Sequence, residues 1–255
     1  TIAERLTAAD LADATADATF VVEAVAEDVE VKRALLARVS RMVADATTIA
    51  TNTSSIPIGM LASAVHRPER FLGVHWFNPP EWTPGVEVIP AVATAPEVVE
   101  RLVEFLRSIG KRPAAVGDGP GFVANRIQNA LFLEAVRCVE EGLASPQEVD
   151  EVVRSCFGFR LPFFGPFQIS DMAGLDVYEN VLDVLKEGLG ERFTAPQSLR
   201  KLVEEGRTGT KSGAGFLEYT DEERERLLLE RDRRYAALGA LLEDLPPVDV
   251  GKDTS

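Results

Sequence analysis

Cysteine and histidine are scarce in this chain of 255 residues, which contains only two of each. Cys138 and Cys156 cannot form the disulfide framework of a small secreted domain, and we interpret them as buried thiols of a reducing compartment. The patterns H-E-x-x-H and C-x-x-C, which predict zinc sites, are absent, and so is the Walker A pattern of ATPases. We therefore expect no metal site.

Positive charge is also in short supply, since 27 Lys and Arg residues face 41 Asp and Glu residues, for a net charge of −14. A nucleic-acid partner is excluded because such proteins carry a basic surface. No apolar run approaches the roughly 18 residues of a membrane span, and the first residues lack the pattern of an export signal. The composition predicts a cytoplasmic globular protein with a small-molecule partner and no membrane partner.

The first hundred or so residues alternate between short apolar runs and amphipathic helical patterns. Such alternation is typical of an α/β fold with a doubly wound parallel sheet. The predicted strands are 20–25, 48–51, 71–75 and 86–89, and the predicted helices are 31–43 and 96–109.

The character of the chain changes after Gly117–Gly121, since no strand is predicted over the next hundred residues. The apolar residues from Ile127 to Val139 are spaced as in a helix and would cover much of its circumference. Such a helix is predicted to be buried inside a domain or in a dimer interface. We therefore expect an α/β domain over 1–117, an all-helical domain over 118–219, and a charged helix with a disordered tail over 220–255. Capping boxes are predicted at Ser145–Glu148 and Thr220–Glu223, and Pro246-Pro247 is expected to end the last helix.

One histidine is a candidate general base. His66 lies in a polar connection and is expected at the surface, whereas His75 ends a predicted buried strand, where open α/β sheets bind ligands. Glu87 lies in an apolar strand, where a carboxylate is costly unless it is paired, and His75 is a suitable partner. The alternatives are a strand-end histidine bonded to a backbone carbonyl, and a Glu87 that faces solvent or pairs with an arginine.

Polar groups near the same edge complete the candidate site. Asn52-Thr53-Ser54 follows a strand and offers amide and hydroxyl groups, although such a turn is also common without function. Asn125 opens the helical domain and either points into a cleft or is an ordinary polar group at a helix start. No phosphate-binding G-x-G-x-x-G pattern is present, because Phe122 and Glu218 stand where the third glycine is needed.

The order of these motifs resembles the NAD-dependent 3-hydroxyacyl-CoA dehydrogenase family over roughly residues 12–219. The segments that carry the resemblance are Val22-Glu23-Ala24, Asn52–Ser55, His75–Pro79, Val86–Ile89, Pro120–Arg126, Gly165–Phe167, Gly174–Asp176 and Lys211–Phe216.

The resemblance implies a Rossmann-type domain, N-terminally incomplete here, followed by a helical domain that forms a homodimer, and it implies NAD as cofactor and a place in fatty acid metabolism. It implies that His75 is the base, that Glu87 orients it, and that Ser54 and Asn125 hydrogen-bond the reacting oxygens. The positions that would line the cofactor and substrate cleft are Ala24, Glu27, Lys32, Asn52, Asn78 and Lys211.

Two departures from the family pattern leave alternatives open. The family begins with a phosphate-binding strand, glycine-rich turn and helix that this sequence lacks, so we expect the chain to be part of a longer one, with a truncated non-catalytic chain as the alternative. The Asn78-Pro79-Pro80 segment also resembles relatives that oxidise free hydroxy acids, such as L-gulonate and carnitine dehydrogenases. The Gly165–Phe167 and Gly174–Asp176 segments favour the acyl-CoA branch. The resemblance therefore implies hydride transfer between NAD and a (S)-3-hydroxyacyl-CoA, with a free hydroxy acid as the alternative substrate.

Overall fold

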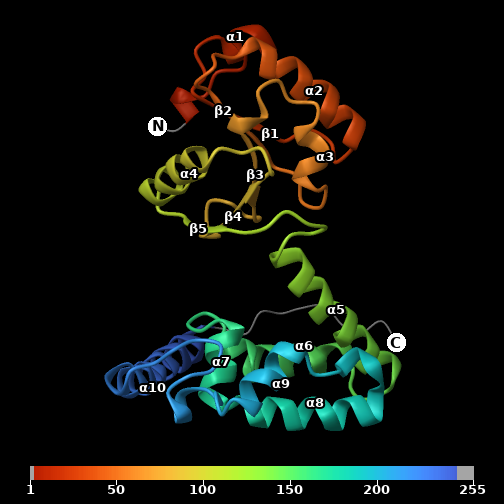
Figure 1. The fold of residues 1–255 in the computed structure, drawn as a ribbon, viewed down its shortest axis with the longest axis vertical. Coiled ribbons are helices and arrows are strands. Elements are labelled where there is room, and N and C mark those ends of the chain that lie inside the picture. Colours follow the sequence, from red (N-terminus) through yellow and green to blue (C-terminus); the bar gives the residue numbers. More distant parts are fainter. Residues whose placement is uncertain (1–2, 246–255) are drawn as a thin grey trace. The chain divides into compact units, whose positions relative to one another are not determined.

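The computed structural model describes residues 3–245, and Figure 1 shows that its strands form one sheet with the order β1-β2-β3-β4-β5. All neighbouring strands are parallel except β3 and β4. The strands are β1 (Phe20–Glu23), β2 (Thr48–Thr51), β3 (Phe71–Trp76), β4 (Gly85–Pro90) and β5 (Arg112–Ala115). The first four coincide with predicted strands, and β5 was not predicted.

Helices cover both faces of this sheet, as expected of a doubly wound fold (Figure 1). Successive strand residues point to opposite faces. Ile49 and Phe71 therefore pack with Leu36 of α2 (Val29–Met42), next to α1 (Leu11–Ala16) and α3 (Ile58–Ala62). Their neighbours Ala50 and Leu72 pack on the opposite face against α4 (Pro96–Ser108).

The direction of β4 is the main difference from the predicted all-parallel sheet. The short connection between Trp76 and Gly85 cannot hold a crossover helix, so the chain turns back and β4 runs antiparallel to β3. β5 then pairs parallel to β4 at the edge of the sheet. Pro113 lies in β5, and an edge strand is where proline is tolerated, because one side of the strand needs no backbone donor.

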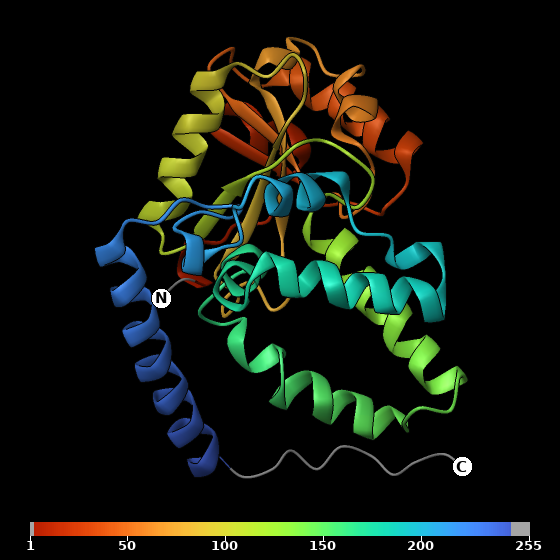
Figure 2. The same ribbon diagram turned by 60° about the horizontal axis from the view of Figure 1, so that its bottom comes forward.

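The chain divides into two compact units, Thr1–Val136 and Arg137–Ser255. α5 (Ala124–Glu140) begins in the first unit. In the second unit, Leu175, Ala195 and Leu199 form a small buried core, and no named strand follows β5 within residues 3–245. Its helices are α6 (Pro146–Ser155), α7 (Pro166–Ala173), α8 (Leu175–Leu189), α9 (Gln197–Glu204) and α10 (Asp221–Asp244), the last drawn as one unbroken blue helix in Figure 2.

Both predicted capping boxes are confirmed, at Ser145–Glu148 of α6 and Thr220–Glu223 of α10. No residue of α5 is buried within this single chain. Burial inside a domain is therefore not observed for this helix, and the alternative, a dimer interface, stays a prediction. The burial prediction for the two cysteines is wrong. Cys156 is exposed and Cys138 only partly buried. Cys138 lies on α5 and Cys156 directly follows α6, and neither helix has a buried residue. Pro246-Pro247 and the tail from Val248 lie outside the described residues.

Candidate active site

His75 and Glu87 face one another across the antiparallel pair β3 and β4. The register places them directly opposite, so their side chains emerge on the same face of the sheet. His75 Nδ1 lies 2.8 Å from Glu87 Oε2, and both residues are buried. The predicted pairing is therefore confirmed, whereas His66 is exposed, as expected.

The second oxygen of Glu87 is also satisfied. Glu87 Oε1 accepts hydrogen bonds from the backbone N–H groups of Val123 at 3.0 Å and Ala124 at 2.9 Å, where α5 begins. The first N–H groups of a helix lack partners within the helix and favour a negative charge. The start of α5 thus supplies the hydrogen bonds to Oε1, while Oε2 faces the imidazole.

The contact with Glu87 fixes how the imidazole of His75 can act. An ionised carboxylate only accepts hydrogen bonds, so Nδ1 must carry the proton and Nε2 is left with its lone pair. Among the described residues, His75 Nε2 has no hydrogen-bond partner. The ring packs between Phe77 and Phe122, with centroid distances of 4.5 and 5.6 Å. This arrangement suits an imidazole that removes a proton from a ligand.

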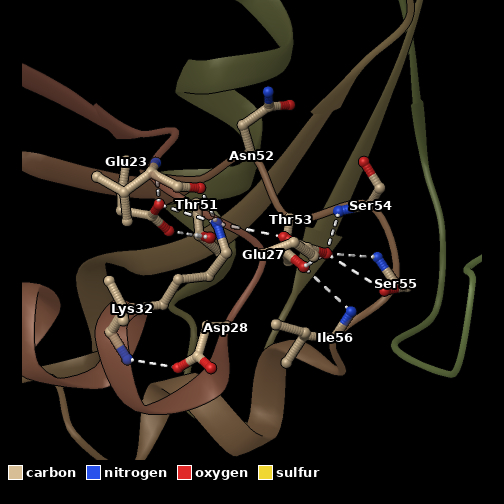
Figure 3. A network of polar contacts seen from close by, with 12 residues as sticks. Glu23, Glu27, Asp28, Lys32, Thr51, Asn52, Thr53, Ser54, Ser55 and Ile56 are labelled. Atoms are coloured by element: carbon tan, nitrogen blue, oxygen red, sulfur yellow. Dashed lines mark hydrogen bonds and ion pairs between the residues drawn. The ribbon is translucent and has the colours of Figure 1, made fainter.

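Ser54 and Asn125 come from distant parts of the sequence and lie in contact. Asn125, in the first turn of α5, donates from Nδ2 to the backbone oxygen of Ser54 at 2.7 Å. Ser54 is exposed, and its hydroxyl makes no hydrogen bond with the described residues. In Figure 3 this hydroxyl points away from the polar network below it. It is therefore free to bond a ligand.

Asn52 belongs to the same turn, directly after β2. Its backbone N–H donates to Glu23 O at 2.7 Å, and its side-chain Oδ1 accepts from Trp76 N at 3.1 Å. In Figure 3 the amide NH2 group points away from the network around Glu27 and Lys32. Ala24 and Asn78 are exposed and follow β1 and β3, whose carboxyl ends lie at the same edge as that of β2 because the three strands are parallel.

Glu27 and Lys32 lie beneath this turn (Figure 3). Glu27 Oε1 accepts from Thr53 Oγ1 at 2.6 Å, from Ser54 N at 2.9 Å and from Ser55 N at 3.1 Å. Burial opposes its ionisation, but these hydrogen bonds and Lys32 outweigh burial and hold the pKa of Glu27 below its ordinary value. The carboxylate therefore acts as the anchor of the turn.

Lys211 lies in the second unit and forms an ion pair with Asp176, with Nζ 2.5 Å and 2.6 Å from the two carboxylate oxygens. The hydrogen bond from Lys211 holds the pKa of Asp176 below its ordinary value. The loop that carries Lys211 closes onto Asp171, which is fully buried. Asp171 accepts from Phe216 N, Leu217 N and Tyr219 Oη, each at 3.0 Å.

Sequence reasoning missed the anchoring roles of Glu23 and Asp171. Glu23 lies in the apolar strand β1, so the argument that gave Glu87 a partner would also have found Glu23 and Lys32. Asp171 offers no such signal, because its partners are backbone groups and a tyrosine distant in sequence. Within residues 3–245, no cluster of three or more His, Cys, Asp or Glu side chains could hold a metal ion.

Comparison with known families gives two matches that together span most of the chain. Residues 1–119 match the NAD binding domain of 3-hydroxyacyl-CoA dehydrogenase, and residues 121–219 match its C-terminal domain. No helix among the described residues is long and apolar enough to cross a membrane.

Two curated relatives differ in how much they share. The 5-formyl-3-hydroxy-2-methylpyridine 4-carboxylate 5-dehydrogenase of Mesorhizobium japonicum is 39% identical over 236 residues, 92% of this chain and 76% of that protein. The fatty acid oxidation complex subunit alpha of Shewanella oneidensis is 41% identical over 203 residues, 80% of this chain and 28% of that protein. The chain thus spans under a third of the length of the second relative.

Among solved structures, the 3-hydroxyacyl-CoA dehydrogenase of Archaeoglobus fulgidus is similar with a TM-score of 0.79 and 32% identity, covering 93% of this chain and 80% of that one. The 3-hydroxybutyryl-CoA dehydrogenase of Escherichia coli has a TM-score of 0.56 and 40% identity, covering 81% and 43%. With both domains matched and the sheet and helices in place, the chain belongs to the NAD-dependent 3-hydroxyacyl-CoA dehydrogenase family.

Proposed function

We propose that this chain oxidises the 3-hydroxyl carbon of a (S)-3-hydroxyacyl-CoA, with His75 as the general base. The observation that carries the proposal is the 2.8 Å contact between His75 Nδ1 and Glu87 Oε2, which leaves Nε2 as the acceptor. His75 Nε2 takes the proton from the 3-hydroxyl oxygen, while a hydride leaves the carbon that carries this hydroxyl. Glu87 stabilises the positive charge that the imidazole gains. NAD, when bound, supplies the ring that accepts the hydride.

The other predicted residues have supporting roles in this proposal. Ser54 and Asn125 hydrogen-bond the reacting oxygen, which is supported by the unpaired hydroxyl of Ser54 and by the contact between the two residues. The strand ends fit one side of a dinucleotide, because ligands of open α/β sheets bind at the carboxyl ends of strands. The cofactor-lining positions in the first unit are Ala24, Asn52 and Asn78 at this edge, together with Glu27 and Lys32. Lys211, in the second unit, stays a separate prediction from the resemblance.

A free hydroxy acid is the second candidate substrate class. It is favoured by the relative from Mesorhizobium japonicum, whose name describes a pyridine carboxylate as substrate and whose match covers 92% of this chain, against 80% for the fatty acid oxidation subunit. Initial rates with (S)-3-hydroxybutyryl-CoA and with free hydroxy acids separate the two classes. Turnover of the free acids alone would overturn the acyl-CoA assignment and the place in fatty acid metabolism.

The base assignment is tested with His75→Ala in the full-length enzyme. We expect kcat to fall by roughly 10²- to 10⁴-fold, because a general base contributes about that much. His66→Ala is the matched control, since His66 is the other histidine and is exposed. Glu87→Gln is expected to lower kcat as well, because the imidazolium loses its carboxylate. An unchanged kcat for His75→Ala would remove His75 from the mechanism.

We also propose that the protein is a cytoplasmic homodimer. Exposed apolar side chains on α5, among them Ile127, Phe132 and Leu133, would be covered by the partner. We expect Phe132→Glu to give a monomer in sedimentation equilibrium, with Leu229→Glu on α10 as the control. A dimer lost only with Leu229→Glu would instead assign the interface to α10.

The free cysteines suit the proposed cytoplasmic location. Export of the tagged full-length protein in cell fractionation would contradict that location.

A further inference from the structure

Phe122, just before α5, has a backbone conformation that is unusual for a bulky residue. Its φ angle is +50°, in the left-handed region. Side chains other than glycine are strained there, because Cβ crowds the backbone. The side chain is nevertheless buried, with 4% of its surface exposed. A strained residue persists only where its neighbours hold it, and such residues gather at functional sites.

The connection from β5 to α5 (Figure 1) is fastened to α3 before it reaches Phe122. Asp118 accepts from the backbone N–H groups of Ile58 and Gly59, each at 2.8 Å. These groups open α3, and the residue before that helix supplies no side-chain cap. The N–H group of Phe122 then donates to Gly119 O at 3.0 Å. The chain is thus held in place as it enters the strained conformation.

The backbone after Phe122 is directed at Glu87. The next two N–H groups, of Val123 and Ala124, both donate to Glu87 Oε1, at 3.0 and 2.9 Å. Gly121 has a positive φ of +71° as well. Turns of this kind direct successive N–H groups at one anion. Glycine would adopt the same backbone at position 122 without strain, so the path of the chain does not by itself require a phenylalanine ring.

The ring of Phe122 contacts the candidate base. Its centroid lies 5.6 Å from that of the His75 imidazole, and among the described residues Phe77 is the other ring in contact with that imidazole. One hydrogen bond to Glu87 holds Nδ1 of His75 but leaves the imidazole able to tilt about that bond. Packing against a buried ring opposes such a tilt. Phe122 therefore acts on the orientation of the imidazole.

We propose that Phe122 is a positioning residue, whose strained backbone sets its ring against His75 and the following N–H groups on Glu87. One segment thus fixes both members of the histidine–glutamate pair. The inference rests on the proposed role of His75 as general base. Because Nε2 must point at the proton that it removes, a tilt of the imidazole lowers the rate of the chemical step and leaves binding of substrate and cofactor nearly unchanged.

The first test is Phe122→Leu in the full-length enzyme, with Phe71→Leu as the matched control. Phe71 belongs to the same buried apolar cluster and is fully buried, but its ring does not contact His75. We expect kcat of Phe122→Leu to fall by roughly 10- to 10²-fold, while KM and the Kd of NADH change less than about threefold. The control should keep its kcat. Equal falls in both variants would reduce Phe122 to core packing, and a higher KM with unchanged kcat would assign its ring to substrate binding.

Phe122→Gly separates the ring from the backbone. Glycine adopts the positive φ without strain, so the N–H groups of Val123 and Ala124 should stay on Glu87 while the ring is lost. This variant also replaces Phe122→Leu if circular dichroism shows that the leucine variant is unfolded. We expect the same fall in kcat as for Phe122→Leu. A kcat equal to that of the natural enzyme would overturn the proposal.

Nuclear magnetic resonance of the imidazole protons gives a readout that does not depend on activity. The chain has two histidines, so His66→Ala identifies the signal of His75. The proton between Nδ1 and the buried Glu87 is shielded from water, and we expect it to exchange faster in Phe122→Leu and at the natural rate in Phe71→Leu. If the natural enzyme turns over no substrate, the proposed function fails while faster exchange still supports the positioning role. Unchanged exchange in Phe122→Leu overturns the inference whatever the substrate is.

Discussion

Two segments that carry predicted site residues are each fastened to carboxylates, which are buried in Glu23 and Asp171 and partly exposed in Glu27. These carboxylates are stabilised in different ways. Under the Asn52–Ser55 turn, Glu23 and Glu27 share the ammonium of Lys32. Under the Lys211 loop, Asp171 meets two backbone N–H groups and the hydroxyl of Tyr219, with no cation within ion-pair distance among residues 3–245. Buried charge can thus be stabilised by one cation or by several dipoles.

The two anchors differ in which substitutions would disrupt them. The turn depends on a single side chain, because removal of Lys32 leaves two carboxylates without their cation. The Asp171 anchor is spread over backbone groups that most substitutions leave in place. Burial and the hydrogen bond to Asp171 raise the pKa of Tyr219, so that this hydroxyl keeps its proton and remains a donor. Only Asp171 itself and the residues packed on it are sensitive points.

Asp171→Ala is expected to give the largest loss of stability, about 3 kcal/mol, because three donors lose their fully buried acceptor. Urea unfolding followed by circular dichroism measures the loss. Trp76 and Trp82 both lie in the first unit, so their fluorescence should report an unchanged transition there. The control is Asp176→Ala, which removes a partly exposed carboxylate and should cost far less, because solvent screens an exposed ion pair. Equal losses of stability in the two variants would show that the buried Asp171 stabilises the protein no more than the partly exposed Asp176.

Gly215→Ala is expected to cost about 2 kcal/mol through overpacking. A Cβ at Gly215 would lie 2.1 Å from Asp171 Oδ1, so the loop must move off its carboxylate. Gly188 near the end of α8 is the control, since a Cβ there meets nothing within 4 Å. Because alanine is the better helix former, Gly188→Ala should be neutral or stabilising by up to about 1 kcal/mol. Thermal unfolding of both variants checks the contrast, and a stable Gly215→Ala would show that the loop is loosely held.

Glu27→Gln is expected to have the smallest effect on stability and to show it only as a change in pH dependence. The pKa of Glu27 is lower in the folded protein than its ordinary value of 4.5. Its ionisation therefore adds stability above pH 4.5, and this contribution is lost as the pH falls through the lower folded value. Tryptophan fluorescence during urea unfolding at several acidic pH values should show a shallower acid-side loss in Glu27→Gln. An identical dependence of the unfolding free energy on pH in both proteins would mean that the negative charge of Glu27 does not stabilise the turn.

The sequence predicts the strands of the sheet well where they are continuous apolar runs. It predicts them poorly where pairing with a neighbouring strand determines that a segment is a strand, or in which direction it runs. Thr48–Thr51 is a strand with the predicted bounds, and Phe71 and Val86 lie in predicted strands. β5 contains Pro113 and two alanines, so no local signal marks it, and its pairing with β4 alone makes it a strand. Likewise, the antiparallel direction of β4 follows from a short connection and not from its apolar pattern.

For the site, the sequence could identify residues by the cost of burying their charge but not by their partners. Glu87 was found this way, whereas His75 was found by its place at the end of a predicted strand. Asn125 was found as a helix-start polar group, yet its bond to the Ser54 carbonyl spans distant segments and needs the fold. Glu27 and Lys32 were assigned to the cofactor cleft, and only the distances reveal that Lys32 is enclosed by acceptors. Their direct contact with the cofactor stays a prediction.

The pairing of β3 with β4 makes the contact between His75 and Glu87 independent of the length of the loop that joins the two strands. Because the backbone bonds fix His75 opposite Glu87, the part of the connection from Pro80 to Pro84 can lengthen or shorten without moving either side chain. A single residue inserted within β4, in contrast, would turn Glu87 to the opposite face of the sheet and leave the imidazole without its carboxylate. Evolution can therefore vary this loop to suit new substrates while the histidine–glutamate pair is inherited unchanged, and an engineer can use the same insertion point.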